Sequence, residues 1–233
     1  MNSEEIQKKL YEKLIPSGWG DVLKPFIMSD DFIEILKELY KCASRGERFT
    51  PPLKYVFRAF EECPYEDLRV IFIGQDPYPK LGVADGISFS CSLTKTPQPS
   101  LRYMFWEIER TVFQEFPSGQ NPDLTRWANQ GILMLNTALT CEVGRIGSHI
   151  SVWKPFTEFL LTNIVNRYTG IVYVLLGKKA EEWEHLIDAK NNYILKCSHP
   201  ASAAYNRGKW DSNNIFTEIS KIIENTEGLN ITW

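Results

Sequence analysis

The stretch that decides the fold reads RVIFIGQDPYP and runs from Arg69 to Pro79. Its first half, Arg69 to Ile73, is a short apolar run rich in β-branched residues, which is typical of a buried strand and too short for a helix. Its second half contains Gly, Gln, Asp, Pro and Tyr, a composition typical of a turn. The stretch is therefore predicted to be a buried strand that ends in a polar turn.

Three further runs resemble the first and are predicted to be strands: Ile132 to Asn136, Ile171 to Leu176 and Tyr193 to Cys197. Periodic stretches of helical length lie between or beside them. They cover residues 4–14, 31–43, 100–116, 154–168, 178–189 and 213–224, with Pro155 near the first turn of its helix. Strands that alternate with helices predict a parallel sheet that is buried on both faces.

No internal repeat, low-complexity tract or linker interrupts the chain, so one domain is expected over residues 1–233. The predicted fold class is α/β. In full, it is a single-domain α/β/α sandwich with a central four-stranded, parallel, twisted sheet flanked by helices.

The composition excludes several protein classes. Hydrophobic residues make up 43% and charged residues 24% of the 233 residues, which argues against a disordered, collagenous or coiled-coil chain. The formal net charge is −3, so a nucleic-acid partner would have to be held by a local patch. The five cysteines are widely separated and never form a CxxC pair, which indicates free thiols in a reducing compartment and argues against a zinc or iron–sulfur site. No metal, cofactor, secretion signal or membrane span is predicted.

Polar side chains follow the predicted strands where each strand ends. Asp76 follows the first strand, Asn136 ends the second, Lys178 follows the third and His199 follows the fourth. Because ligands of open parallel sheets bind beyond the carboxyl ends of the strands, we expect these side chains to lie close together.

These residue types can perform a definite chemistry. A carboxylate can orient water or balance a developing cation, and an imidazole can donate to an oxygen that gains negative charge. An Asn side chain donates and accepts side by side, which matches the O4 and N3–H edge of uracil, whereas cytosine presents the reverse pattern. Lys178 is the only lysine at these strand ends, so a Schiff-base mechanism is not favoured.

Each residue alone also has a simpler interpretation. Asp76 before Pro77 is common in turns, Asn136 could cap the next segment, and His199 could be tied to the backbone of its loop. Phe89 could belong to the core, and Lys178 could begin a solvated helix. The coincidence of several polar residues at consecutive strand ends favours a functional site.

At these residues the chain resembles the family 1 uracil-DNA glycosylases. The resemblance is carried by residues 74–78, by residues 131–137, and by His199-Pro200 followed by Arg207-Gly208. It extends through residues 18–23 and 56–60 and through Ser148-His149 with Phe156-Thr157, and it covers nearly the whole chain. It implies a monofunctional, metal-free enzyme that hydrolyses the N-glycosidic bond of uracil in DNA.

Carried over position by position, the resemblance implies two catalytic residues. Asp76 would position the attacking water and offset the charge of the oxocarbenium-like sugar, and neutral His199 would donate to uracil O2. It implies three further contacts to the base: Asn136 would read O4 and N3–H, Phe89 would stack on the ring, and Tyr78 would sit against C5, where a thymine methyl would collide.

The resemblance also implies contacts beside the base and along the DNA. Gln75 would lie beside the base and Ser100 would touch a phosphate. Two positions depart from the family pattern, because Pro79 stands where a histidine is usual and Lys178 where a phosphate-binding serine is usual. Arg207 lies in a loop that carries basic residues and no carboxylate between Ile194 and Trp210, which favours a local DNA surface although chance could produce it.

The largest departure lies in the loop that the family inserts into DNA. The family usually has the sequence HPSPLS, whereas residues 199–204 read HPASAA. Ala203 thus stands at the position of the leucine wedge, Ala201 and Ala204 replace two phosphate-binding serines, and Ser202 offers the neighbouring hydroxyl. Two hypotheses address the missing wedge: Tyr205 or Lys209 partly replaces it, or the enzyme favours single-stranded DNA.

Two rival functions remain open at this point. A DNA-holding module could keep the fold with weak or no catalysis. A generic nucleotide-binding enzyme is disfavoured because no Gly-rich phosphate loop follows the first strand. The implied partners are uracil-containing DNA, single- or double-stranded, and protein inhibitors of these enzymes. No membrane is implied, and a monomer is expected in the cytoplasm, or in the nucleus if the source is eukaryotic or viral.

Overall fold

Four parallel strands form the central sheet in the order β3-β2-β5-β6. They are β2 (Val70–Gly74), β3 (Ile132–Asn136), β5 (Val172–Leu176) and β6 (Tyr193–Cys197). The computed structural model describes residues 3–113, 121–165 and 168–233. The predicted α/β class and its four-stranded parallel sheet are confirmed, and β3 and β6 have the predicted bounds.

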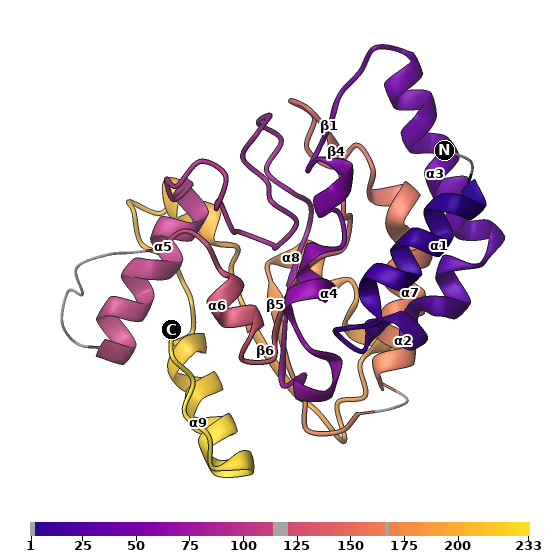
Figure 1. The fold of residues 1–233 in the computed structure, drawn as a ribbon. Helices are drawn as coiled ribbons and strands as arrows, with labels where there is room; N and C mark the ends of the chain where they lie inside the picture. The colour runs from indigo at the N-terminus through magenta and orange to yellow at the C-terminus, as the bar shows by residue number, and fades with distance from the viewer. Residues whose placement is uncertain (1–2, 114–120, 166–167) are drawn as a thin grey trace.

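Helices cover both faces of this sheet (Figure 1). On one side lie α1 (Ser3–Leu14), α2 (Trp19–Ile27), α3 (Asp30–Ser44) and α7 (Ile150–Val165), and on the other side lie α5 (Pro99–Ile108), α6 (Thr125–Ala128) and α9 (Ile215–Glu227). Two short helices, a π-helical segment and several 3₁₀ turns complete the main elements. The short helices are α4 (Arg58–Glu62) and α8 (Lys178–Glu181), and the π-helical segment is Glu109–Phe113. The 3₁₀ turns are Leu53–Tyr55, Tyr65–Asp67, Glu184–Leu186 and Pro200–Tyr205. None of the helices in the described ranges is long and apolar enough to cross a membrane.

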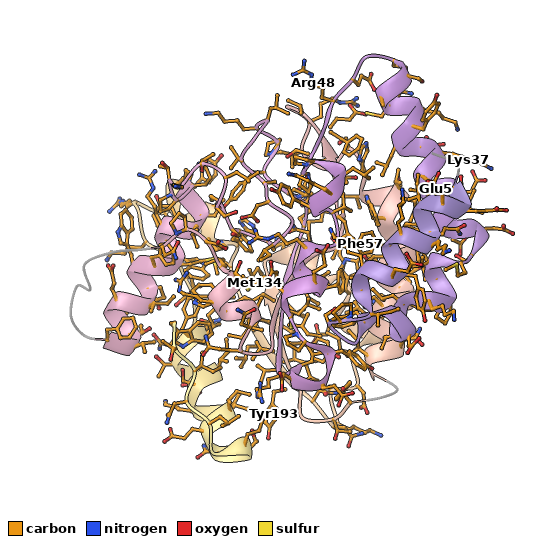
Figure 2. The ribbon with its side chains drawn as sticks, viewed as in Figure 1. Glu5, Lys37, Arg48, Phe57, Met134 and Tyr193 are labelled. Carbon is orange, nitrogen blue, oxygen red and sulfur yellow. The ribbon has the colours of Figure 1, made fainter. Side chains whose placement is uncertain are left out.

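The strands form the centre of the core. Every residue of β2 and β5 is buried, as expected for a parallel sheet covered on both faces. Figure 2 shows Phe57 and Met134 among the interior side chains and Glu5 and Lys37 at the periphery. Many of the aromatic residues pack edge to face in this core, as Trp153 does with neighbouring rings, so much of the high aromatic content serves packing.

Several helix boundaries differ from the prediction. The helix expected over 178–189 is wrong beyond its first turn. The backbone N–H groups of Trp183 and Leu186 donate to carbonyls three residues back, at Ala180 and Trp183, and not four residues back as in an α-helix. Helix α7 begins at Ile150, four residues before the predicted start, and α9 begins at Ile215 because Asn213 and Asn214 adopt positive φ angles of 52° and 54°. Parts of two predicted helices, residues 114–116 and 166–167, lie outside the described residues.

Some elements are absent from the sequence prediction. A second, two-stranded antiparallel sheet pairs β1 (Phe49–Thr50) with β4 (Cys141–Glu142). Two-residue strands are too short to show the alternation by which strands are recognised. Helix α2 was also missed, because it contains Gly20 and Pro25, which both disfavour a helix interior.

Candidate functional site

A cavity of about 360 Å³ opens beyond the carboxyl ends of the strands. This volume falls in the range of roughly 300–1,000 Å³ that is usual for small-molecule sites. The strand order places the cavity beside β2 and β5, whose following connections run to opposite sides of the sheet. All six residues predicted to touch the base or the reacting water line it: Gln75, Asp76, Tyr78, Phe89, Asn136 and His199.

Asp76 is held by donors on both of its carboxylate oxygens. The backbone N–H of Gly147 donates to Oδ2 at 2.5 Å, and Nε2 of Gln75 donates to Oδ1 at 3.2 Å. Burial raises the pKa of this carboxyl above its ordinary value, and the two hydrogen bonds oppose that rise. A carboxylate fixed in this way faces the cavity in one orientation and can hold a water molecule or balance a nearby cation.

Asn136 lies beside Asp76 because the last residue pair of the β2–β3 ladder is Gly74 with Asn136. Ser88 Oγ donates to Asn136 Oδ1 at 2.7 Å, which orients the amide so that its NH₂ group remains free to donate. Gly74 makes this pair possible, since a Cβ on it would come within 2.7 Å of Asn136 Oδ1 and 2.9 Å of Ser88 Oγ. Asn136 therefore presents a donor and one further acceptor site in a fixed orientation.

His199 is held in one tautomer when it is neutral. The backbone N–H of Ala201 donates to His199 Nδ1 at 3.1 Å, so Nδ1 carries a lone pair and the proton of the neutral ring lies on Nε2. Burial lowers the pKa of His199 below its ordinary value of 6.5, which favours the neutral form at pH 7. Gly177, at a φ of +80°, allows this close approach, because a Cβ there would lie 3.0 Å from His199 Cβ.

Phe89 and Tyr78 form one wall of the cavity. Phe89 has a positive φ of 64°, which is uncommon for a bulky residue and marks a constrained backbone. Tyr78 Oη donates to the Phe89 carbonyl at 3.0 Å, and the rings of Phe89 and His199 lie 5.7 Å apart. The loop that carries Phe89 is tied together by Asp85, which is fully buried.

The predicted DNA contacts divide into two groups. Pro79, Ser100, Lys178 and Ala201 line the mouth of the same cavity. The other four, Ser202, Ala203, Ala204 and Arg207, lie outside the cavity lining.

Within the second group, only some side chains are accessible. Ala203 is fully buried and offers no side-chain surface to DNA in this conformation. Ser202 Oγ donates to Ser198 Oγ at 3.1 Å, and Ala204 and Arg207 are exposed. The most exposed side chain of this loop is Tyr205, with 94% of its surface accessible.

Sequence reasoning missed the segment that supports Asp76. Gly147 contributes a backbone N–H, which leaves no signature in a side chain, and Ile146 lines the cavity from the same loop. The signal in the sequence was the pair Gly144 and Gly147, both with positive φ, which marks a sharply turned loop.

Among the described residues, the one group of three or more His, Cys, Asp and Glu side chains placed to hold a metal lies outside this cavity.

Comparisons with known proteins find one matching family and several similar chains. The family model of the Uracil DNA glycosylase superfamily matches residues 60–224. The uracil-DNA glycosylase of Borrelia turicatae is 34% identical over 95% of this chain and 99% of its own length, and that of Dichelobacter nodosus is 36% identical over 82% and 83%.

Solved structures agree in fold. The mimivirus uracil-DNA glycosylase superposes with a TM-score of 0.83 at 24% identity, over 94% of this chain and 86% of that protein. A variant of the mimivirus enzyme in complex with UGI has a TM-score of 0.82 at 24% identity, over 92% of this chain and 87% of that protein.

Proposed function

The chain belongs to the uracil-DNA glycosylase superfamily, and from this premise we propose that it flips uracil out of DNA and hydrolyses the N-glycosidic bond, releasing free uracil and leaving an abasic site. The observation that carries the proposal is the gathering of Asp76, Asn136 and His199 around one cavity at the ends of three strands. An enzyme that acts on a base must extrude it from the stack into such a pocket.

In this mechanism Asp76 acts on the sugar side of the bond. As the bond breaks, positive charge develops on the sugar, and the ionised carboxylate of Asp76 offsets it. The same carboxylate orients the water that attacks the anomeric carbon. The N–H of Gly147 and the side chain of Gln75 hold Asp76 in place for both tasks.

His199 acts on the departing base. The base leaves with its electron pair, so negative charge develops on the oxygens of uracil. The Nε2–H of the neutral ring donates a hydrogen bond to O2 and stabilises this charge without transferring a proton. The bond from the Ala201 N–H to Nδ1 keeps the proton on Nε2, where this role requires it.

The remaining side chains read the base. The NH₂ of Asn136 donates to O4 and its oxygen accepts from N3–H, a match that cytosine cannot make. Phe89 stacks on the ring, and Tyr78 occupies the space that a 5-methyl group would need. Ser88 supports this specificity because it fixes which end of the Asn136 amide faces the base.

A uracil-release assay on a defined oligonucleotide tests the proposal. We expect free uracil and an alkali-sensitive abasic site from an oligonucleotide with one uracil, and neither product from the matched thymine and cytosine oligonucleotides. Release should be lost in a variant that combines Asp76→Asn with His199→Ala. DNA binding without any release of uracil would overturn the proposal in favour of a DNA-holding module.

The pH dependence of the reaction follows from the two catalytic groups. Asp76 must be ionised and His199 neutral, so acid inactivates both. The pKa of Asp76 is raised from 3.8 and that of His199 is lowered from 6.5, each by burial. We therefore expect kcat/KM to be constant near pH 7 and to fall only below pH 6.5. The fall occurs between pH 6.5 and 3.8, where His199 gains a proton and Asp76 loses its charge. Initial rates at constant ionic strength measure this profile, and an acid limb centred above pH 6.5 would contradict it.

Tyr205 is the residue of the loop best placed to enter the DNA stack. The residue at the usual wedge position, Ala203, is fully buried, whereas Tyr205 is 94% exposed two residues later. An aromatic ring can stack where the flipped base was and offset the lost base stacking. We infer that the Tyr205 ring inserts into the DNA stack in place of the family's leucine wedge. Arg207 and Lys178 attract the backbone phosphates beside it.

Replacing Tyr205 with Ala tests this assignment. Stacking of a base on an aromatic ring contributes about 1–3 kcal/mol, so we expect kcat/KM on duplex DNA to fall about 5- to 150-fold. Release from single strands, which need no opening, should change far less, and Tyr205→Phe should restore duplex activity. Tyr193→Ala is the matched control, since Tyr193 is also exposed but begins β6, at the end of that strand opposite to the loop. Equal losses on duplex and single strands would rule out a wedge.

A further inference from the structure

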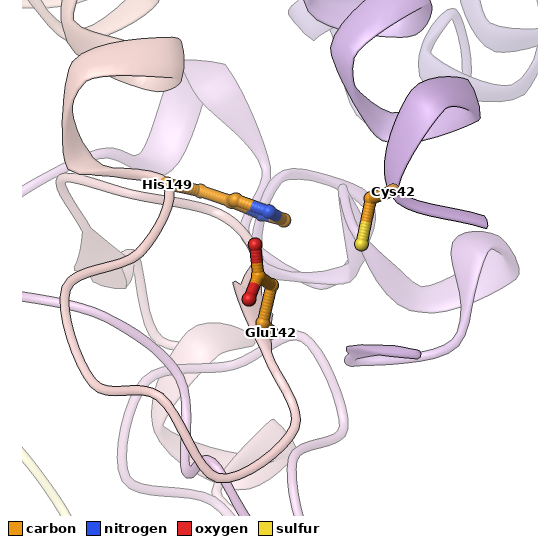
Figure 3. A group of neighbouring side chains, drawn as sticks. All are labelled: Cys42, Glu142 and His149. Atoms are coloured by element: carbon orange, nitrogen blue, oxygen red, sulfur yellow. The ribbon is translucent and has the colours of Figure 1, made fainter. Parts of the chain in front are cut away.

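Three side chains of metal-binding type converge at a place that the proposed reaction does not use. They are Cys42 near the end of α3, Glu142 in β4 and His149 just before α7. Their ligand atoms all lie within 4.8 Å of one another, and the three residues are buried, with 1%, 8% and 5% of their surfaces exposed. Figure 3 shows the three side chains pointing toward one another from separate segments of the chain.

The donor set of this cluster matches one class of metal ion. A thiolate, an imidazole and a carboxylate together are typical of Zn²⁺ and related transition metals, whereas Mg²⁺ and Ca²⁺ prefer oxygen ligands alone. The thiolate and the carboxylate would balance the two positive charges of the ion. Bond lengths of about 2.0–2.3 Å around a tetrahedral ion separate its ligands by about 3.3–3.7 Å. Because no pair of the three atoms is more than 4.8 Å apart, no pair needs to approach by more than about 1.5 Å.

The surroundings of two ligands support binding. His149 Nδ1 lies 2.8 Å from Thr140 Oγ1, which also accepts from Trp153 Nε1 at 2.8 Å. A hydroxyl oxygen has two lone pairs, so it can accept from Nδ1–H as well, which leaves the lone pair of Nε2 free for a metal. Arg145 pairs with Oε2 of Glu142 and thereby positions the carboxylate with Oε1 available.

We propose that Cys42 Sγ, Glu142 Oε1 and His149 Nε2 bind one divalent transition metal ion, with Zn²⁺ the closest match, and that a water molecule completes the tetrahedron. The ion would join α3, through Cys42, to both ends of the loop between Glu142 and His149. That loop carries Gly147, whose N–H holds Asp76. The ion would therefore stabilise the fold and, if the proposed function is right, brace the catalytic carboxylate.

Metal titration of the full chain tests the site. The protein is freed of metal with a chelator and titrated with Zn²⁺ by calorimetry and with Co²⁺ by absorption spectroscopy, with Mg²⁺ as the negative control. We expect one equivalent of Zn²⁺ to bind and to raise Tm. With Co²⁺ we expect the visible bands of tetrahedral coordination and a thiolate charge-transfer band in the near ultraviolet.

Substitutions locate the ion. Cys42→Ala should abolish the charge-transfer band, and Glu142→Gln should weaken Zn²⁺ binding at least tenfold while keeping the shape of the side chain. Thr140→Val, which removes the hydroxyl that supports His149 and also accepts from Trp153 Nε1, should weaken binding about 10- to 100-fold. Cys63→Ala and His185→Ala are the matched controls, because both residues lie outside the cluster.

Two results would overturn the proposal: no stoichiometric Zn²⁺ binding by the folded chain, or binding with the thiolate band intact in Cys42→Ala. Circular dichroism of each variant shows whether it has folded, and Glu142→Gln serves as the test if Cys42→Ala does not fold. Uracil release by the metal-free protein separates this proposal from the proposed function. Release without metal binding refutes only the site, whereas metal binding without release refutes only the glycosylase activity.

Discussion

Asp76→Asn is expected to lower kcat for uracil release by about 10²–10⁴-fold, the range usual for loss of a positioned acid or base. Asn keeps the shape of the side chain and can still accept from the N–H of Gly147, but it carries no charge to offset the sugar cation. Because burial opposes the ionised form of Asp76, loss of the charge should not lower Tm. Single-turnover release from a single-stranded oligonucleotide measures the chemical step without a contribution from duplex opening.

The control for this variant is Asp67→Asn, since Asp67 is exposed and precedes β2 at the opposite end of the strand. It should release uracil at the rate of the unmodified chain. The DNA affinity of Asp76→Asn should stay within a fewfold of the original, because its role is realised in the transition state. A parallel loss of affinity and kcat would instead assign Asp76 to binding.

The sheet and the strand ends were predictable because both follow from strong local signals. Short apolar runs rich in β-branched or aliphatic residues are typical of buried strands, and parallel strands bring their carboxyl ends to one edge of the sheet. That rule alone placed Asp76, Asn136 and His199 together, and they line one cavity. Their roles came from the family resemblance and await the experiments above.

Contacts made by the backbone and by distant side chains were not predictable in this way. Gly147 reaches Asp76 through its N–H, and Ala203 is buried although its position in the loop motif implied exposure. Cys42, Glu142 and His149 were passed over because metal sites are recognised in sequence by short spacings, whereas these residues meet only in the folded chain. Tertiary packing decides such juxtapositions, and neither composition nor periodicity reports it.

Asp85 is another residue whose importance is visible only in the structure. Its carboxylate accepts from the N–H groups of Ile87 and Ser92 at 3.1 and 2.9 Å, from Ser90 Oγ at 2.6 Å, and lies 3.0 Å from Arg58 Nη1. Arg58 is largely buried as well, with 13% of its side chain exposed. A buried charge with this many donors organises the loop that carries Ser88 and Phe89.

Asp85→Ala is therefore expected to lower the free energy of unfolding by about 3–5 kcal/mol. It removes the nearest of the three carboxylates around the buried Arg58 guanidinium and leaves the N–H groups of Ile87 and Ser92 without their acceptor. Urea denaturation followed by tryptophan fluorescence measures this loss. Asp85→Asn keeps two acceptor lone pairs and should lose less. The control Asp31→Ala removes an exposed carboxylate from the first turn of α3 and should cost about 1 kcal/mol or less. If Asp85→Ala were as stable as that control, Asp85 would not be what holds the Phe89 loop, and the wall of the cavity would owe its shape to packing alone.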